Sequence, residues 1–310
     1  MRRNMLFVSA VCVIVAMTII IGCGSNDNGY SNGDINGIYI SDCLNHRIIR
    51  INDMSSSGWV EYGYYGSGVG QFIEPAGIDI GPDGKIYVID TGNNRIVRID
   101  DMTGTGWITY GNRGSGMGQF QFDKLSDISI GPDGKIYGTD TWNNRIVRMD
   151  DMTGTGWITY GTEGSESGEF NWLGGIDVGE DNKIYIADYG NDRIVRIDNM
   201  TGEGWVSYNF RNAFNVAVEP NGKIYMVSEN GIIGRIDDMT GTGRLSYGSE
   251  ELFDEPTGID IGIDNRIYIA DDDDRIIRIN DMSGSGWIEY GTSGSGVGEF
   301  DNPRSVVVVP

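Results

Sequence analysis

The sequence contains few of the residues that most often carry out catalysis. Among 310 residues there is one histidine, His46, and three cysteines, of which Cys43 lies three residues before that histidine. A zinc site of the usual kind or a serine–histidine–aspartate relay cannot be assembled around this one imidazole. Cys43 and His46 could form a nucleophile–base pair, but no residue that would orient them is evident. We therefore expect no catalytic residue.

Basic residues are also scarce. The chain has 23 Lys and Arg against 45 Asp and Glu, which gives a formal net charge of −22. Clusters of basic side chains bind nucleic acids and anionic lipid head groups, so this composition disfavours both as partners. Cations, basic peptides and neutral polymers are more compatible with it, although such a charge also has an ordinary role in solubility.

Near its start the sequence has an apolar run. Two arginines precede the charge-free residues 5–21, which is the arrangement of a secretory signal. The next residues, Ile20-Ile21-Gly22-Cys23, resemble the lipobox of bacterial lipoproteins. The resemblance implies a signal peptide over 1–22, lipidation of Cys23, and a flexible tether over 23–36. It also implies a cell-envelope lipoprotein, at the outer membrane or the outer face of the cell membrane, held to the membrane only by its lipid.

A sixfold repeat occupies the rest of the chain. An Ile-Tyr signature recurs at Tyr39, Tyr87, Tyr137, Tyr185, Tyr225 and Tyr268, in steps of 48, 50, 48, 40 and 43 residues. Each unit has four short segments rich in Ile, Val, Tyr and Trp that Gly, Asp or Asn residues bound, as is typical of strands. Both alternating faces of these segments are largely apolar, so each sheet must be covered on both sides. Radial stacking of the sheets in a β-propeller provides that cover.

The motifs of the second unit resemble the NHL repeat. They read Pro75-x-Gly77-Ile-Asp-Ile, then Asp83-Gly, then Ile86-Tyr-x-x-Asp90-x-x-Asn93-Asn-Arg95-Ile, with Gly-x-Gly-Gln71-Phe72 ahead of them. The likeness extends over residues 37–310. It is weakest in the fourth and fifth units, where the linker lacks its glycine-rich stretch, Ser228 replaces an aspartate and Arg244 replaces a tryptophan.

The two ends of the repeat region complement each other. The chain enters the first unit at the Gly37-Ile-Tyr strand, with no strand one before it, and residues 303–310 align with residues 75–82 of the second unit. We therefore predict an all-β, six-bladed β-propeller over 37–310, with four antiparallel strands per blade. The C-terminal strand would pair within the N-terminal blade and remove an exposed edge.

Charged residues that recur in the units have structural interpretations. Asp42, Asp90, Asp140, Asp188 and Asp271 end the second strand, where they would accept backbone hydrogen bonds in the following turn. The repeated Asp-Asp-Met-Thr-Gly-Thr-Gly loops favour turn formation over weak calcium sites. Asp79, Asp177 and Asp260 recur in only three units; they could pair with arginines across blades or line the channel.

Loops that differ between blades are the best candidates for a recognition surface. They follow the second strand or enter the first, and by family resemblance they share one face. Their candidate ligand-binding residues are Tyr64, Tyr65, Phe122, Trp142, Trp172, Tyr189, Phe210 and Arg211. Trp142 and Trp172 stand out because no other blade has tryptophan there.

The mouth of the central channel offers a second candidate site. Asp127 and Asn215 fall where strand one begins, and their oxygens could reach a calcium ion or could instead bond to the backbone there. Two such residues are few for a metal site, so we expect no cofactor, with calcium as the alternative. The sequence favours a monomeric, non-catalytic scaffold that binds a protein, peptide or glycan. The alternative is a metal-dependent lyase or lactonase at the channel mouth.

Overall fold

The computed structural model describes residues 35–124 and 126–309. The expected signal peptide, Cys23 and most of the expected tether lie outside these residues. Within the described part of the chain, no helix is long and apolar enough to cross a membrane.

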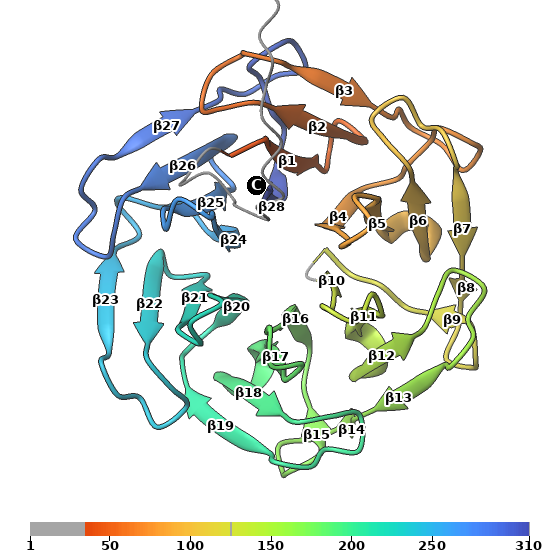
Figure 1. The fold of residues 1–310 in the computed structure, drawn as a ribbon, viewed down its shortest axis with the longest axis vertical. Helices are drawn as coiled ribbons and strands as arrows, with labels where there is room; N and C mark the ends of the chain where they lie inside the picture. Colours follow the sequence, from red (N-terminus) through yellow and green to blue (C-terminus); the bar gives the residue numbers. More distant parts are fainter. Residues whose placement is uncertain (1–34, 125, 310) are drawn as a thin grey trace, which may run out of the picture. The chain divides into compact units, whose positions relative to one another are not determined.

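Six four-stranded antiparallel sheets form a ring around a central axis (Figure 1). Blade 1 has β28 (Pro303–Val309), β1 (Gly37–Asp42), β2 (Arg47–Ile51) and β3 (Val60–Tyr62). Blade 2 has β4 (Pro75–Ile80), β5 (Ile86–Asp90), β6 (Arg95–Ile99) and β7 (Ile108–Tyr110). Blade 3 has β10 (Ile128–Ile130), β11 (Ile136–Asp140), β12 (Arg145–Met149) and β13 (Ile158–Tyr160).

The remaining blades follow the same order, from the inner strand outward. Blade 4 has β16 (Leu173–Val178), β17 (Ile184–Asp188), β18 (Arg193–Ile197) and β19 (Val206–Asn209). Blade 5 has β20 (Ala213–Val218), β21 (Ile224–Ser228), β22 (Ile232–Ile236) and β23 (Leu245–Gly248). Blade 6 has β24 (Pro256–Ile261), β25 (Ile267–Asp271), β26 (Arg275–Ile279) and β27 (Ile288–Tyr290). The prediction of a six-bladed propeller is confirmed.

Short elements connect strands within the blades and connect one blade to the next. The turns after β5, β11 and β17 are 3-10 helices η1 (Thr91–Asn93), η2 (Thr141–Asn143) and η3 (Tyr189–Asn191). Two linkers form small parallel ladders, β8 (Asn112–Arg113) with β9 (Gln119–Phe120) and β14 (Thr162–Glu163) with β15 (Glu169–Phe170).

Apolar side chains from neighbouring blades pack between the sheets. One core cluster joins Tyr137 and Ile146 of blade 3 to Ile176 and Ile186 of blade 4, and all four are at most 6% exposed. Because both faces of each blade carry such residues, each blade completes the core of its two neighbours. This packing explains why both alternating sets along the strands are apolar.

Strand β28 closes the ring. It pairs antiparallel with β1, with Tyr39 opposite Val307 and Gly37 opposite Val309. The Asn36 N–H extends the ladder by donating to the Val309 carbonyl at 2.8 Å. Figure 1 shows β28 as the innermost strand of the blade that begins with β1. The predicted pairing of the two ends is therefore confirmed.

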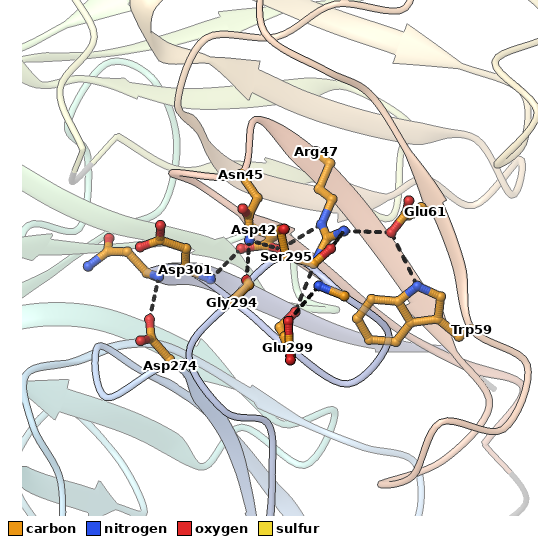
Figure 2. A network of polar contacts seen from close by, with 12 residues as sticks. Asp42, Asn45, Arg47, Trp59, Glu61, Asp274, Gly294, Ser295, Glu299 and Asp301 are labelled. Carbon is orange, nitrogen blue, oxygen red and sulfur yellow. Dashed lines mark hydrogen bonds and ion pairs between the residues drawn. The ribbon is translucent and has the colours of Figure 1, made fainter.

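An aspartate, an asparagine and an arginine anchor the glycine-rich linker in front of blade 1, an arrangement we call the linker clamp (Figure 2). Asp42 Oδ2 accepts from Arg47 Nε at 2.7 Å, and Arg47 Nη1 donates to the Ser295 carbonyl at 2.8 Å. Asn45 donates to the Gly294 carbonyl at 2.7 Å. The same clamp recurs in blades 2, 3 and 4 around Asp90, Asp140 and Asp188.

One detail of the sequence interpretation needs correction. The backbone N–H groups that these aspartates accept belong to the linker entering the blade, not mainly to the following turn. Asp42 accepts from Asp301, and Asp90 accepts from Ile73, both at 2.8 Å. In the five blades that have it, the aspartate at the end of the second strand therefore fixes the linker that leads into the first strand of the same blade.

Candidate binding face and channel mouth

The linkers and the turns after the second strands share one face of the ring, which we call the linker face. Pro75, where β4 begins, lies opposite Asp90, where β5 ends. The same antiparallel arrangement recurs in the other blades, so each blade places its linker and its turn side by side. The predicted grouping of the variable loops on one face follows from this register.

A left-handed residue after each of five turns, in blades 1, 2, 3, 4 and 6, bonds one blade to the next. Asn144 has a φ of 49°, and its Oδ1 accepts the Trp172 N–H at 2.8 Å. Left-handed backbone suits asparagine, whose short side chain bonds locally. His46 takes the same place in blade 1, with a φ of 57°, and its Nδ1 accepts the Glu74 N–H at 3.1 Å. The imidazole thus serves a connection between blades.

Cys43 lies beneath this turn rather than on the surface. Its side chain is 3% exposed, and burial raises the pKa of the thiol to about 12. A thiol with such a pKa is neutral at physiological pH and a weak nucleophile. Cys43 is thus a buried, neutral thiol, and the His46 imidazole is engaged with the backbone of the next blade.

Four aromatic rings form a continuous row across blades 3, 4 and 5, which we call the aromatic row. The ring centroids of Trp142 and Trp172 are 5.7 Å apart, those of Trp172 and Tyr189 are 5.8 Å apart, and those of Tyr189 and Phe214 are 5.4 Å apart. Trp142 is 57% exposed and Trp172 38% exposed, whereas Phe214 is buried. The row therefore runs from an exposed tryptophan pair to a buried ring at the channel mouth.

The other predicted face residues are placed differently. Tyr64 and Tyr65 are 60% and 65% exposed but belong to the linker between blades 1 and 2. Phe122 is only 6% exposed, because it stacks on Phe120 with centroids 4.5 Å apart in the core between blades 2 and 3. Only Trp142, Trp172 and Tyr189 among the predicted residues are brought together in the row.

Phe210 and Arg211 line a pocket of ≈ 670 Å³ near the edge of blades 4 and 5, which Arg244 also lines. The pocket opens where blade 5 has lost its linker clamp. Ser228 stands in place of the aspartate and Ile232 in place of the arginine, and the linker before β20 is too short for a glycine-rich loop. The shortened linker, Ser228 and Arg244, which depart from the repeat in the sequence, therefore all border this pocket.

The channel along the axis has a volume of ≈ 280 Å³ and is lined by carboxylates. Asp79, Asp177 and Asp260 come from blades 2, 4 and 6, and each accepts a backbone N–H from the next blade, at 2.6 to 2.7 Å. They line the channel rather than pairing with arginines. Because Ser129, Ala217 and Val307 occupy the equivalent places in the blades between, an ionisable side chain alternates with an uncharged one around the axis.

Asp127 and Asn215 lie together at the mouth, as the sequence suggested. Asn215 Nδ2 donates to Asp127 Oδ2 at 3.3 Å, and the Ile176 N–H donates to the same oxygen at 3.3 Å. Burial raises the pKa of Asp127 to about 7. Residues 35–124 and 126–309 contain no group of three or more His, Cys, Asp or Glu placed to hold a metal ion. These contacts are those of residues that bond to the backbone where the strands begin.

Sequence reasoning did not identify Arg304 as a site residue. This arginine follows Pro303 in β28 and lines the mouth pocket together with Lys124, Phe214 and Thr257. It is 8% exposed, and its Nε and Nη1 have no hydrogen-bond partner among the described residues. Arg304 could have been identified from the sequence because it aligns with five uncharged residues in the other blades, namely Ala76, Ser126, Gly174, Phe214 and Thr257.

A comparison with known protein families identifies one of the repeats. The NHL repeat family model matches residues 72–99. The match covers the second unit, and the six sheets show that the other units adopt the same four-stranded fold as this NHL repeat. No curated protein matches the chain.

Solved structures of the same fold have low sequence identity to this chain. A catalytically inactive virginiamycin B lyase from Staphylococcus aureus, solved with quinupristin, is 20% identical, with 74% of this chain and 73% of the lyase covered and a TM-score of 0.54. A streptogramin B lyase is 17% identical, with 89% and 88% covered and a TM-score of 0.60. A chain of a nidogen/laminin complex is 14% identical, with 88% and 98% covered and a TM-score of 0.67. At these identities the likeness concerns the fold alone.

Proposed function

We propose that this chain is an exported, lipid-anchored binding protein that recognises a protein, peptide or glycan on its linker face without catalysing a reaction. The observation that carries the proposal is the aromatic row, in which two exposed tryptophans stand where the other blades have none. Exposed aromatic residues on a rigid scaffold are characteristic of recognition sites, because they bury much area at little cost in conformational entropy.

The backbone of Trp172 supports this assignment. Its φ is 55°, a left-handed conformation that is uncommon for bulky side chains and costs about 1 kcal/mol or more. Asn212 and Asn302 occupy the equivalent place with φ of 53° and 58°, and Glu74 and Glu255 occupy it with φ of 52° and 46°. Trp172 is the one aromatic residue among these five, and a bulky ring at such a position supports a role beyond folding.

The charge of the chain and the solved neighbours favour a macromolecular partner. A net charge of −22 disfavours nucleic acid. A propeller of the same fold occurs in the nidogen/laminin complex, so this architecture can present a protein-binding surface. The tether that would hold the propeller at the cell envelope depends on Cys23, and labelling with a radioactive fatty acid, lost in Cys23→Ser, tests that part of the proposal.

The alternative of a metal-dependent lyase or lactonase has weaker support. Asp127 and Asn215 do meet at the axis, and two of the solved neighbours are lyases. Asp127 Oδ2 is, however, already used by Asn215 and by the Ile176 N–H. Calcium titration of the purified protein tests this function, since an enzyme of this kind would bind the ion tightly and lose it in Asp127→Asn.

The binding function is tested by comparing the partners that the Trp172→Asn variant captures with those that the wild-type protein captures. The substitution removes the ring but restores a residue that favours the left-handed backbone, so the gain of about 1 kcal/mol offsets the ring packing of about 0.5–1.5 kcal/mol that is lost. We expect the fold to persist and affinity to fall by about tenfold or more.

Met117→Ser is the matched control, because Met117 is a 74% exposed apolar residue in another linker. If Trp172→Asn and Trp142→Ser both retain every partner that the wild-type protein captures, the aromatic row is not the binding surface. Loss of binding in Met117→Ser as well would point to a general effect of surface apolar area rather than to the row.

A further inference from the structure

A β-bulge marks the entry of the chain into the channel wall in blade 1. Ser305 pairs with Ser41 and Pro303 pairs with Asp42, so Arg304 is the extra residue between them. Bulges re-aim side chains and are frequent beside binding sites. The equivalent register shift in blade 5 leaves Phe214 as the extra residue, and both side chains line the mouth pocket.

Arg304 has donors that the folded protein leaves unused. Nε and Nη1 are buried without a partner, and Nη2 lies 3.7 Å from Asp272 Oδ1, which itself accepts no hydrogen bond from the described residues. The nearby Cys43 thiol is neutral at physiological pH and accepts only weakly. A buried guanidinium without full pairing is costly, and the uncharged residues in the other five blades demonstrate that the bulge does not need one.

The mouth pocket restricts what can reach these donors. Its volume is ≈ 10 Å³, which is about the space of one water-sized group. A ligand can therefore insert only its tip. Carboxylate oxygens form the strongest pairs with guanidinium. The wall of the same pocket also contains Lys124, which adds a positive charge, and Asp127, whose pKa burial raises to about 7, so that this carboxyl is partly neutral at physiological pH.

The surroundings favour one source for that carboxylate. Phe214 is both the last ring of the aromatic row and a wall of the mouth pocket, so a ligand lying along the row brings its end to Arg304. A polymer with many carboxylates would be repelled by a chain of net charge −22. A peptide with apolar side chains and one terminal carboxylate can lie along the aromatic row and carries few negative charges.

We infer that the channel mouth binds the C-terminal carboxylate of a peptide or protein partner through Arg304, while the preceding side chains of the partner contact the aromatic row. The inference rests on the proposed binding function and specifies its partner class. It assigns Arg304 the selection of free chain ends and assigns the tryptophans affinity for the adjoining side chains.

The test compares two random libraries of short acetylated peptides, one with free C-terminal acids and one with C-terminal amides, for binding to the full-length protein. We expect the acids to bind about tenfold or more tightly, as for other buried charge pairs. Arg304→Ser, which copies Ser126 of blade 3, should abolish this preference. Arg304→Lys should retain part of it, since the charge remains without the planar fork.

The outcomes separate this inference from the proposed function. Equal binding of acids and amides that still requires Trp172 would overturn the role of Arg304 and leave the binding face intact. A preference for acids that persists in Arg304→Ser would overturn it as well. If no peptide binds but an oligouronate does, through Arg304, the ligand is an acidic glycan and the inference is wrong. If nothing that binds depends on Trp172, the proposed face itself fails.

Discussion

The side chain at the left-handed position after a turn connects neighbouring blades at the scale of single residues. Asn94 and Asn144 each accept a backbone N–H from the next linker through Oδ1. His46 makes the same bond through Nδ1. An amide and an imidazole are interchangeable here because each offers one acceptor at a similar reach.

Replacement of His46 tests this equivalence. We expect His46→Asn to leave the free energy of unfolding unchanged within about 0.5 kcal/mol, because asparagine supplies the acceptor and tolerates positive φ. His46→Leu removes the acceptor and should cost about 1 kcal/mol. Urea unfolding of both variants provides the measurement. A loss above about 1 kcal/mol in His46→Asn would show that the edge contact between the imidazole and Tyr65, whose ring centroids are 5.0 Å apart, contributes more than the shared hydrogen bond.

Several site residues could be predicted from the sequence, and others could not. Trp142 and Trp172 were identifiable because the repeat supplies five other blades for comparison. The stacking of Phe122 on Phe120 could be expected, because residues two positions apart in an extended chain share one side; Phe122 also lines a pocket with Trp142. Arg304 depends on a bulge, which changes the direction of a side chain without leaving a pattern in the sequence.

The linker clamp stabilises the connection between blades at the scale of elements. In blade 2 the Asp90 side chain is fully buried and accepts from Arg95 Nε at 2.7 Å, and Arg95 is 13% exposed. Removing one partner of a buried ion pair leaves the other uncompensated and costs about 3–5 kcal/mol. Blade 5 folds with Ser228 and Ile232 at these places, so loss of both partners is tolerated in the same chain.

A double-mutant cycle in blade 2 measures this coupling. We expect Asp90→Ser and Arg95→Ile each to destabilise the protein by about 3 kcal/mol. The double variant, which copies blade 5, should be more stable than the sum of the two predicts, by about 1 kcal/mol or more. Chemical denaturation of the four proteins gives the coupling energy. Simple additivity would show that the aspartate and the arginine act through separate contacts.

The fold of the whole molecule was predictable because the six repeats in the sequence can be aligned and compared with one another. The number of blades, the order of the strands and the pairing of β28 with β1 all follow from the alignment of the repeats and are confirmed. The choice between channel lining and ion pairing for Asp79, Asp177 and Asp260 was not predictable. It depends on which side of β4, β16 and β24 faces the axis, and both sides of these strands are compatible with burial.

The raised pKa values of the channel carboxylates make the stability of the whole molecule depend on pH. Burial raises the pKa of Asp177 to about 6 and those of Asp260 and Asp127 to about 7, from the ordinary aspartate value of 3.8. Between pH 4 and pH 7 the folded state therefore binds more protons than the unfolded state. Stability then falls as pH rises through this window and levels off above it.

The free energy of unfolding should accordingly be lower at pH 8 than at pH 5. Asp177 alone contributes about 1.4 kcal/mol to this difference, since only the one pKa unit between pH 5 and its pKa of about 6 is crossed and one unit corresponds to about 1.4 kcal/mol. Asp177→Asn keeps an oxygen for the Val218 N–H but cannot ionise, so it should reduce the slope and gain stability relative to wild type at pH 8. Stability that rises from pH 5 to pH 8 would show instead that the folded channel favours ionised carboxylates, held by the backbone N–H groups of the neighbouring blades.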